Sequence, residues 1–204
     1  MAATPSTMVT LGTPAPAFAL TDVVSGKAIS LPQLKGKVAT VIMFICNHCP
    51  YVKHINAGLV KLVNDYAQQH ISFIAISSND AKKYPEDGPE SMKEAAIHLK
   101  YPFPYLYDET QQVARAFDAA CTPDFFVYDL DLKLAYRGQF DDSRPGNNIT
   151  VTGNDLRLAL DCLLANKPVS PQQKPASGVI LNGSSRARTV QRKITGTNSK
   201  TSVT

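Results

Sequence analysis

The sequence has no tryptophan, only four cysteines among its 204 residues, and no apolar run near the length that crosses a membrane. Its first residues carry neither the basic stretch nor the apolar segment of a secretory signal. Four cysteines are too few to form a disulfide scaffold in a chain of this length. These absences predict a cytoplasmic protein without a membrane partner, in which closely spaced cysteines serve redox chemistry or metal binding.

Acidic residues are missing from the end of the chain. None follows Asp161, whereas seven basic residues do, so residues 1–166 carry 14 bases and 17 acids within a chain of net charge +4. A mildly acidic globular part gives no reason to expect a nucleic-acid partner. After Pro168 the composition is dominated by small and polar residues and bases, which predicts a basic disordered tail over residues 169–204.

Apolar segments of strand and helix length alternate through the rest of the chain, which predicts an α/β fold. Because 44% of the residues are hydrophobic, we expect one core and one domain, at residues 12–168 after an N-terminal tail at 1–11. The expected elements are an N-terminal hairpin within 12–34, a βαβ unit over 38–77, helices near 89–99, 110–117 and 153–165, and an antiparallel hairpin over 124–137.

Two cysteines spaced C-x-x-C stand where the first long strand meets the first long helix. The apolar run 38–45 ends at Cys46, and Cys49 is followed by Pro50, which is tolerated in a first helical turn. A thiol at a helix N-terminus faces unpaired N–H groups and the positive end of the helix dipole, and both favour the thiolate. The corner therefore predicts a reactive thiol pair.

Four segments carry a resemblance to a known family: residues 46–52 (CNHCPYV), 121–129 (CTPDFFVYD), 136–146 (YRGQFDDSRPG) and 151–157 (VTGNDLR). In this order, behind an N-terminal hairpin, they resemble the thioredoxin-like fold. They are most similar to the peroxiredoxin-like thioredoxin family proteins of the alkyl-hydroperoxide-reductase/thiol-specific-antioxidant (AhpC/TSA) group. The resemblance covers about residues 10–170 and implies a mixed central β-sheet with flanking helices and an N-terminal β-hairpin.

The resemblance implies an antioxidant-type oxidoreductase that exchanges disulfides, with no cofactor beyond a redox-active Cys46–Cys49 disulfide. Cys46 is implied to be the exposed nucleophile and Cys49 the more buried resolving thiol. Thr122 and Pro123 match the family's cis-proline site, where main-chain groups of Thr122 would pair with an extended substrate peptide. The implied partners are protein or small-molecule disulfides and an electron-donating thiol system, for a monomer or homodimer.

His48 lies between the two cysteines. An imidazolium there would stabilise the Cys46 thiolate and hence the reduced state, so we expect a couple more oxidising than about −270 mV, the thioredoxin value. The alternative for His48 is a solvated side chain at a helix start.

Proton transfer at the pair is unassigned by the sequence. The buried aspartate of thioredoxin would align with Thr40, so we consider Lys53, Arg137 and Asp141 as substitutes, beside the alternative that each makes a surface pair. Cys121 is either a third redox thiol or, more in keeping with its surroundings, a buried neutral cysteine.

Two alternative functions remain open. In a thiol-dependent peroxidase a threonine or serine stands three residues before the peroxidatic cysteine; if that cysteine is Cys49, the place holds Cys46, so the orienting hydroxyl is absent. A soft-metal carrier would use the cysteine pair with His48 or His54, but no further ligand spacing supports it, and we expect no metal site.

The end of the chain differs from the family branch. Members of the branch continue after Lys-Pro with a segment similar to Ser-Ile-Gly-Cys-Asn-Ile-Lys-Trp-Lys, and one permitted set of codons for residues 176–184 encodes most of it in a neighbouring reading frame. We therefore hypothesise that residues from about 176 onward are a frame-shifted ending. The coding DNA tests this hypothesis.

Overall fold

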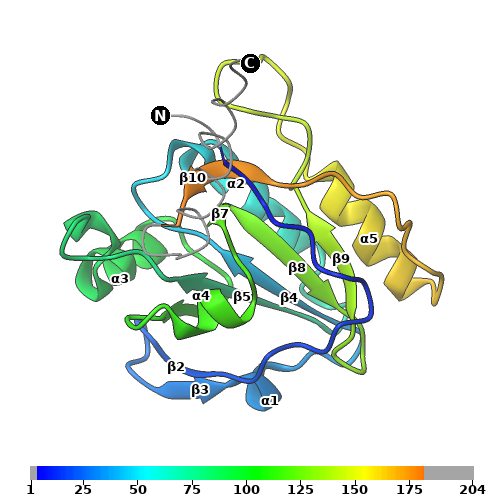
Figure 1. Ribbon diagram of the computed structural model, residues 1–204, viewed down its shortest axis with the longest axis horizontal. Helices are drawn as coiled ribbons and strands as arrows, with labels where there is room; N and C mark the ends of the chain where they lie inside the picture. The colour runs from blue at the N-terminus through cyan, green and yellow to red at the C-terminus, as the bar shows by residue number, and fades with distance from the viewer. Residues whose placement is uncertain (1–3, 182–204) are drawn as a thin grey trace, which may run out of the picture.

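A computed structural model describes residues 4–181 of the chain (Figure 1). The helical elements are α1 (Leu31–Leu34), α2 (Pro50–Asp65), the short 3-10 helix η1 (Pro85–Asp87), α3 (Pro89–His98), α4 (Gln112–Ala116) and α5 (Asn154–Leu164). The strands are β1 (Thr4–Pro5), β2 (Ala19–Asp22), β3 (Ala28–Ser30), β4 (Ala39–Phe44), β5 (Ile71–Ser77), β6 (Tyr105–Tyr107), β7 (Cys121–Thr122), β8 (Asp124–Tyr128), β9 (Leu134–Gly138) and β10 (Ser177–Ile180).

A seven-stranded mixed sheet forms the centre, in the order β3-β2-β6-β5-β4-β8-β9. Strands β4, β5 and β6 run parallel, and β8 lies antiparallel to β4 on its other side. The sheet is extended by antiparallel pairs at both edges, β2 with β3 and β8 with β9. Strand β4, which leads to the cysteine pair, is therefore a central strand with a partner on each side.

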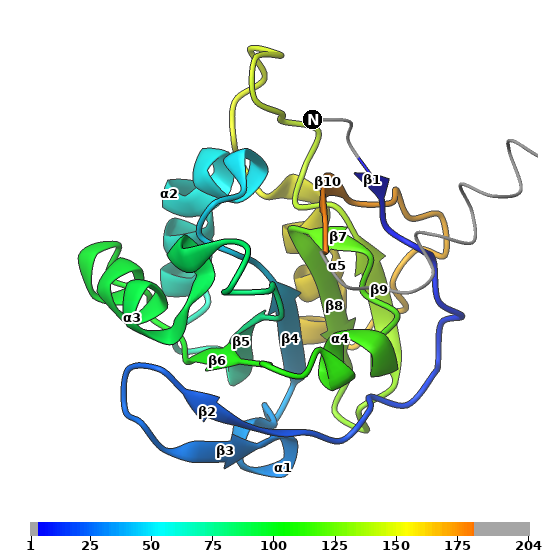
Figure 2. The same ribbon diagram turned by 60° about the vertical axis from the view of Figure 1, so that its left-hand side comes forward.

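Both faces of the sheet are buried, which explains why β4 is apolar at nearly every position. Alternate residues of β4 belong to two separate cores: Val41 and Met43 pack on the side of α2, α3 and α5, while Ile42 and Phe44 pack on the side of α1 and α4. Figure 2 shows α2 and α4 on opposite sides of the central strands. Helix α2 contributes its buried stripe to the first core, at Val52, Ile55, Leu59, Leu62 and Val63.

The predicted α/β class with a mixed central sheet, flanking helices and an N-terminal hairpin is confirmed. The βαβ unit of β4, α2 and β5 lies where the apolar periodicity placed it. The end of β9 and the ends of the helices differ by a few residues from their expected bounds, as is usual at frayed termini.

The predicted disorder from residue 169 is wrong for residues 177–180, which form β10. This strand pairs with β1 on one side and β7 on the other, in a separate three-stranded sheet (Figures 1 and 2). The same pairing orders residues 4–5 of the segment expected to be a loose N-terminal tail. Composition does not reveal these strands, because so short a segment needs few apolar residues. Main-chain hydrogen bonds and the burial of Ala176, Val179 and Leu181 are enough to hold it in place.

The remainder of the predicted tail, residues 182–204, lies outside the described residues, as does most of the segment to which the frame-shift hypothesis applies. Among residues 4–181, no helix has both the length and the apolar character needed to cross a membrane.

Candidate dithiol site

The two cysteines of the C-x-x-C motif sit at the corner between β4 and α2, as the sequence predicted. Cys49 is the N-cap residue of α2 and Pro50 begins the helix. Both cysteines are free thiols, but neither is exposed: the exposed fraction is 1% for Cys46 and 0% for Cys49. The expectation of an exposed Cys46 is therefore wrong for this structure, because side chains and a strand from elsewhere in the chain cover the sulfur.

Thr122 forms the wall opposite the cysteines. Its hydroxyl lies 3.2 Å from the sulfur of Cys46, and its carbonyl oxygen accepts the S–H of Cys49 at 3.2 Å. The peptide bond between Thr122 and Pro123 is cis, as expected from the resemblance. One residue thus contacts both sulfurs, through its side chain and through its main chain.

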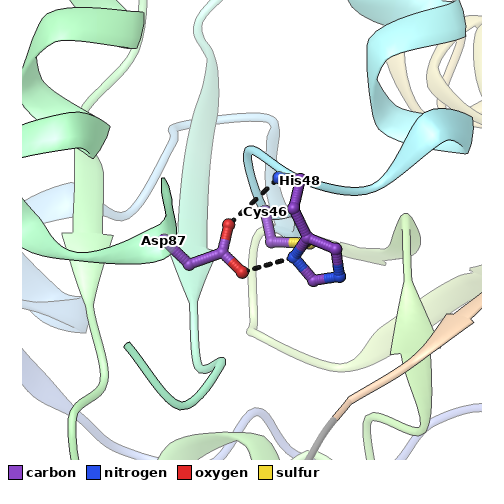
Figure 3. Close-up of side chains that lie close together, drawn as sticks. All are labelled: Cys46, His48 and Asp87. Carbon is purple, nitrogen blue, oxygen red and sulfur yellow. Dashed lines mark hydrogen bonds and ion pairs between the residues drawn. The ribbon is translucent and has the colours of Figure 1, made fainter. Parts of the chain in front are cut away.

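His48 is held against Cys46 by a carboxylate that the sequence did not single out (Figure 3). Its Nδ1 lies 3.6 Å from the Cys46 sulfur and 2.5 Å from Oδ2 of Asp87. The imidazole also stacks on the Tyr84 ring, with 4.2 Å between centroids. With 7% of its side chain exposed, His48 is a packed residue, so the alternative of a solvated side chain is wrong.

Asp87 is completely buried at the end of η1, and both of its oxygens are engaged. Oδ1 accepts the main-chain N–H groups of Asn47 and His48, and Oδ2 also accepts the side-chain amide of Asn79. The carboxylate therefore fixes the backbone between the two cysteines as well as the imidazole. A polar loop carries no periodicity that would mark one acidic residue as buried, so sequence reasoning had no signal for Asp87.

The two sulfurs have opposite electrostatic environments. The pKa of Cys49 is lowered to about 6, chiefly because the S–H of Cys46 donates to its sulfur. Burial raises this pKa, whereas the N–H groups of Val52 and Val179 lower it further. The pKa of Cys46 is raised by its hydrogen bond with Cys49, by burial and by the negative charge of Asp87. The hydrogen bond between the two sulfurs thus favours loss of one proton from the pair, with the negative charge at Cys49, the helix N-cap.

Cys46, His48 and Asp87 together offer three ligand atoms within 4.8 Å of one another. The distance of 2.5 Å between Nδ1 of His48 and Oδ2 of Asp87 is that of a hydrogen bond, shorter than the spacing of two ligands around one metal ion. Asp87 also has three further hydrogen-bond donors. The geometry therefore fits a hydrogen-bonded relay better than a metal centre.

Two of the other residues considered from the sequence, Arg137 and Asp141, have partners away from the thiol pair. Arg137 is buried and donates to Asp124 and to the carbonyl of Asp118. Asp141 accepts three main-chain N–H groups in the loop before α5. Lys53 is exposed on α2.

Cys121 is fully buried, and burial raises the pKa of its thiol. Its sulfur lies 3.9 Å from the carbonyl oxygen of Pro123. These surroundings agree with a buried neutral cysteine.

A mixed sheet with a C-x-x-C pair where its central strand meets a helix, and a cis-proline opposite, defines a thioredoxin-fold protein with a dithiol site. The chain belongs to the AhpC/TSA family, whose model matches residues 11–137. None of the curated proteins matches it.

Two solved structures are similar over nearly the whole chain. An uncharacterized conserved protein from Geobacillus kaustophilus is 59% identical, with a TM-score of 0.87, over 89% of this chain and 96% of that one. A hypothetical protein from Sinorhizobium meliloti 1021 is 44% identical, with a TM-score of 0.86, over 89% and 99%.

A more distant structure shows the fold alone. Peroxidoxin BcpB from Mycobacterium tuberculosis is 19% identical, with a TM-score of 0.58, over 76% of this chain and 96% of that one.

Proposed function

We propose that this protein is a thiol–disulfide oxidoreductase that uses Cys46 and Cys49 as its redox-active pair. The observation that carries the proposal is the convergence of both sulfurs on Thr122, at 3.2 Å each, at the N-terminus of α2. Exchange requires two thiols within reach of one disulfide bond and a stabilised thiolate, and the lowered pKa of Cys49 supplies the second condition.

In the proposed reaction, Cys46 attacks one sulfur of a substrate disulfide. Its proton passes to the Cys49 thiolate with which it is hydrogen-bonded, a bond forms from Cys46 to the substrate, and the other substrate sulfur leaves as a thiolate. The proton of Cys49 then passes to the departing thiolate, Cys49 attacks the sulfur of Cys46, and the bond between Cys46 and the substrate breaks so that the second substrate sulfur leaves as a thiolate. The protein is left with a Cys46–Cys49 disulfide; the substrate has gained two electrons, and an external thiol donor returns the protein to its reduced form.

His48 and Asp87 have supporting roles. The Nδ1–H of His48 lies within reach of both the Asp87 carboxylate and the Cys46 sulfur, so it is placed to stabilise negative charge when Cys46 becomes the nucleophile. Asp87 is a positioning residue, because it holds both the imidazole and the main chain between the cysteines.

Trapping of the mixed disulfide tests the proposal and the order of the two cysteines. With reduced protein and insulin as the disulfide, Cys49→Ser is expected to accumulate a mixed disulfide at Cys46, whereas Cys46→Ser is not. Cys121→Ala serves as the control and is expected to exchange as the wild type does. A mixed disulfide on Cys49 would reverse the two roles, and a wild type that does not reduce insulin would overturn the function.

A thiol-dependent peroxidase is the second candidate. Two observations favour it. The first is the AhpC/TSA family match. The second is the Thr122 hydroxyl, which lies 3.2 Å from the Cys46 sulfur and could replace the orienting hydroxyl that is absent three residues before Cys49. Cys46 would take one oxygen from a hydroperoxide as sulfenic acid and release water or an alcohol, after which Cys49 would form the disulfide with loss of water.

Hydrogen peroxide consumption with dithiothreitol as reductant separates the two candidates. We expect slow consumption, because both sulfurs are buried. In addition, the guanidinium of Arg137 is paired with Asp124 and is therefore not free to bind a peroxide. Rapid turnover that falls in Thr122→Val would place the peroxidase first.

A further inference from the structure

The end of the described chain covers the thiol pair. Strand β10 lies antiparallel to β7 with Val179 opposite Thr122 and Ile180 opposite Cys121, and Figures 1 and 2 both show the two strands side by side. The main-chain N–H of Val179 is among the groups that lower the pKa of Cys49. Val179 is itself buried, in the same apolar cluster as Cys46 and Cys49.

Thr122 is therefore engaged on two sides at once. It contacts both cysteine sulfurs, and its main chain pairs with Val179. An extended peptide that brings a disulfide to Cys46 would need this same edge of the main chain, since pairing along a free strand edge is how an extended segment is held. In this structure a segment of the chain itself occupies the edge.

We propose that β10 is an autoinhibitory strand, which occupies the peptide-binding edge at Thr122 and must leave before Cys46 can react with a protein disulfide. This inference rests on the proposed thiol–disulfide exchange only for its consequence; the covering of the sulfurs is a property of the structure. The step involves no change in covalent bonds: a strand of four residues dissociates from β7, and the two thiols become accessible.

The attachment of β10 is limited enough for such an opening. It stands outside the seven-stranded sheet, and within residues 4–181 it pairs only with β1 and β7, each of two residues. Flanking bonds run between the main chains of Ser6 and Ala176 at 2.8 Å, and from the N–H of Leu181 to the carbonyl of Ala120 at 3.0 Å. Segments held by few hydrogen bonds at the edge of a structure open at a lower free energy than the central strands do.

Gly178 gives a way to remove the strand without changing a residue that contacts the sulfurs. A Cβ at this position would overlap the carbonyl oxygen of Thr122, and it would lie 2.6 Å from the carbonyl carbon and 3.2 Å from the nitrogen of Pro123. All three are main-chain atoms, which cannot rotate away as a side-chain end does. A valine at position 178 is therefore incompatible with β10 in its place.

The test compares Gly178→Val with Ile180→Val, a matched control in the same strand that adds no atoms. Iodoacetamide labelling of native protein, followed by peptide mass analysis, reports access to each cysteine. We expect Cys46 and Cys49 of Gly178→Val to be labelled at least tenfold faster than in the wild type, with Cys121 unchanged. Equal labelling rates in a folded Gly178→Val protein would overturn the proposal.

A measurement on the wild type keeps the test valid if Gly178→Val fails to fold. If opening of β10 controls access, the labelling of Cys46 and the hydrogen exchange of the Leu181 amide should give the same equilibrium constant for opening. This constant should be much larger than the one that the amides of β4 give. Labelling that follows the slowest amides of β4 instead would show that the cysteines react only on global unfolding, and the proposal would be wrong.

Insulin reduction separates this inference from the proposed function. Faster labelling together with faster insulin reduction in Gly178→Val supports both. Faster labelling without any insulin reduction supports the covering strand and overturns the oxidoreductase.

Discussion

Oδ2 of Asp87 lies 2.5 Å from Nδ1 of His48, and both side chains are buried beside the sulfur of Cys46. We propose that the two residues act on that sulfur with opposite electrostatic effects. The ring of His48, whose Nδ1 lies 3.6 Å from the sulfur, would stabilise a Cys46 thiolate, whereas the negative charge of Asp87 adds to the hydrogen bond with Cys49 and to burial in raising the pKa of Cys46.

Substitutions at these two positions are therefore expected to move the redox potential of the Cys46–Cys49 couple in opposite directions. Asp87→Asn removes a negative charge, stabilises the reduced form, and should make the couple more oxidising. His48→Ala removes a donor and should make it more reducing. A shift of about 15–30 mV in each direction corresponds to a roughly three- to tenfold change in the equilibrium constant. Titration against glutathione measures both.

The exposed Asp80 supplies the control, because Asp80→Asn removes the same charge nearby without touching His48. The wild-type potential is expected to be more oxidising than about −270 mV. Shifts of the same sign in Asp87→Asn and His48→Ala would contradict the opposed roles assigned to the two residues.

One thiol of the pair should ionise near pH 6. The lowered pKa of Cys49, about 6 against the ordinary 9.0, predicts one equivalent of thiolate by ultraviolet absorbance between about pH 5 and 7, with Cys46 still protonated. Cys49→Ser should abolish this step. Cys46→Ser should move it to higher pH, because the S–H of Cys46 is the main donor to Cys49.

The same shift links pH to stability. Since the pKa of Cys49 is lower in the folded protein, its thiolate stabilises the fold at pH values above 9, and this contribution is lost as the pH falls toward about 6. In the absorbance titration, a step near pH 6 that survives in Cys49→Ser would place the first thiolate on Cys46.

Asp141 holds the loop that leads into α5. Its carboxylate accepts N–H groups from Ser143 at 2.9 Å and from Thr152 and Gly153 at 2.6 Å each, and these bonds outweigh burial and keep its pKa below the usual range. Asp141→Ala leaves these donors unpaired and should lower the free energy of unfolding by about 2–4 kcal/mol in urea titrations.

The stabilising effect of Asp141 is present above about pH 4 and is lost as the pH falls through its lowered native pKa. Asp131→Ala, at an exposed turn position, should stay within about 0.5 kcal/mol of the wild type. An unchanged urea midpoint in Asp141→Ala would refute the anchoring role.

Asp124 and Arg137 form a fully buried ion pair at 3.0 Å. Removing one partner from such a pair costs about 3–5 kcal/mol, because the other charge stays buried, so Asp124→Ala should destabilise the protein by that order. Denaturant unfolding at neutral pH measures the loss.

Burial raises the pKa of Asp124 to about 6 against the effect of Arg137. Its contribution to stability is therefore complete below about pH 4 and is lost as the pH rises through about 6. Relative to Asp124→Asn, the wild type should lose stability over this interval. A constant difference between pH 4 and pH 7 would contradict the shift.

Much of the fold follows from the sequence because its signals are local. The apolar run of β4 and the helical period of α2 placed the C-x-x-C corner, and the expected cis bond at Thr122-Pro123 is present. Asp87 and β10 could not be found in this way. Asp87 stands 39 residues from His48 in the sequence, and β10 is a segment of four residues, too short to show a period, whose pairing depends on main-chain atoms.

By itself, then, the sequence determined a thioredoxin-like α/β domain with two thiols at a strand-to-helix corner, because apolar periodicity and cysteine spacing act over a few neighbouring residues. Only the tertiary structure decided which groups surround those thiols. Burial beneath β10, the carboxylate of Asp87 behind His48, and the distant pairing of Arg137 with Asp124 all depend on contacts between segments far apart in the chain. Those contacts set the access and the charge at the two sulfurs.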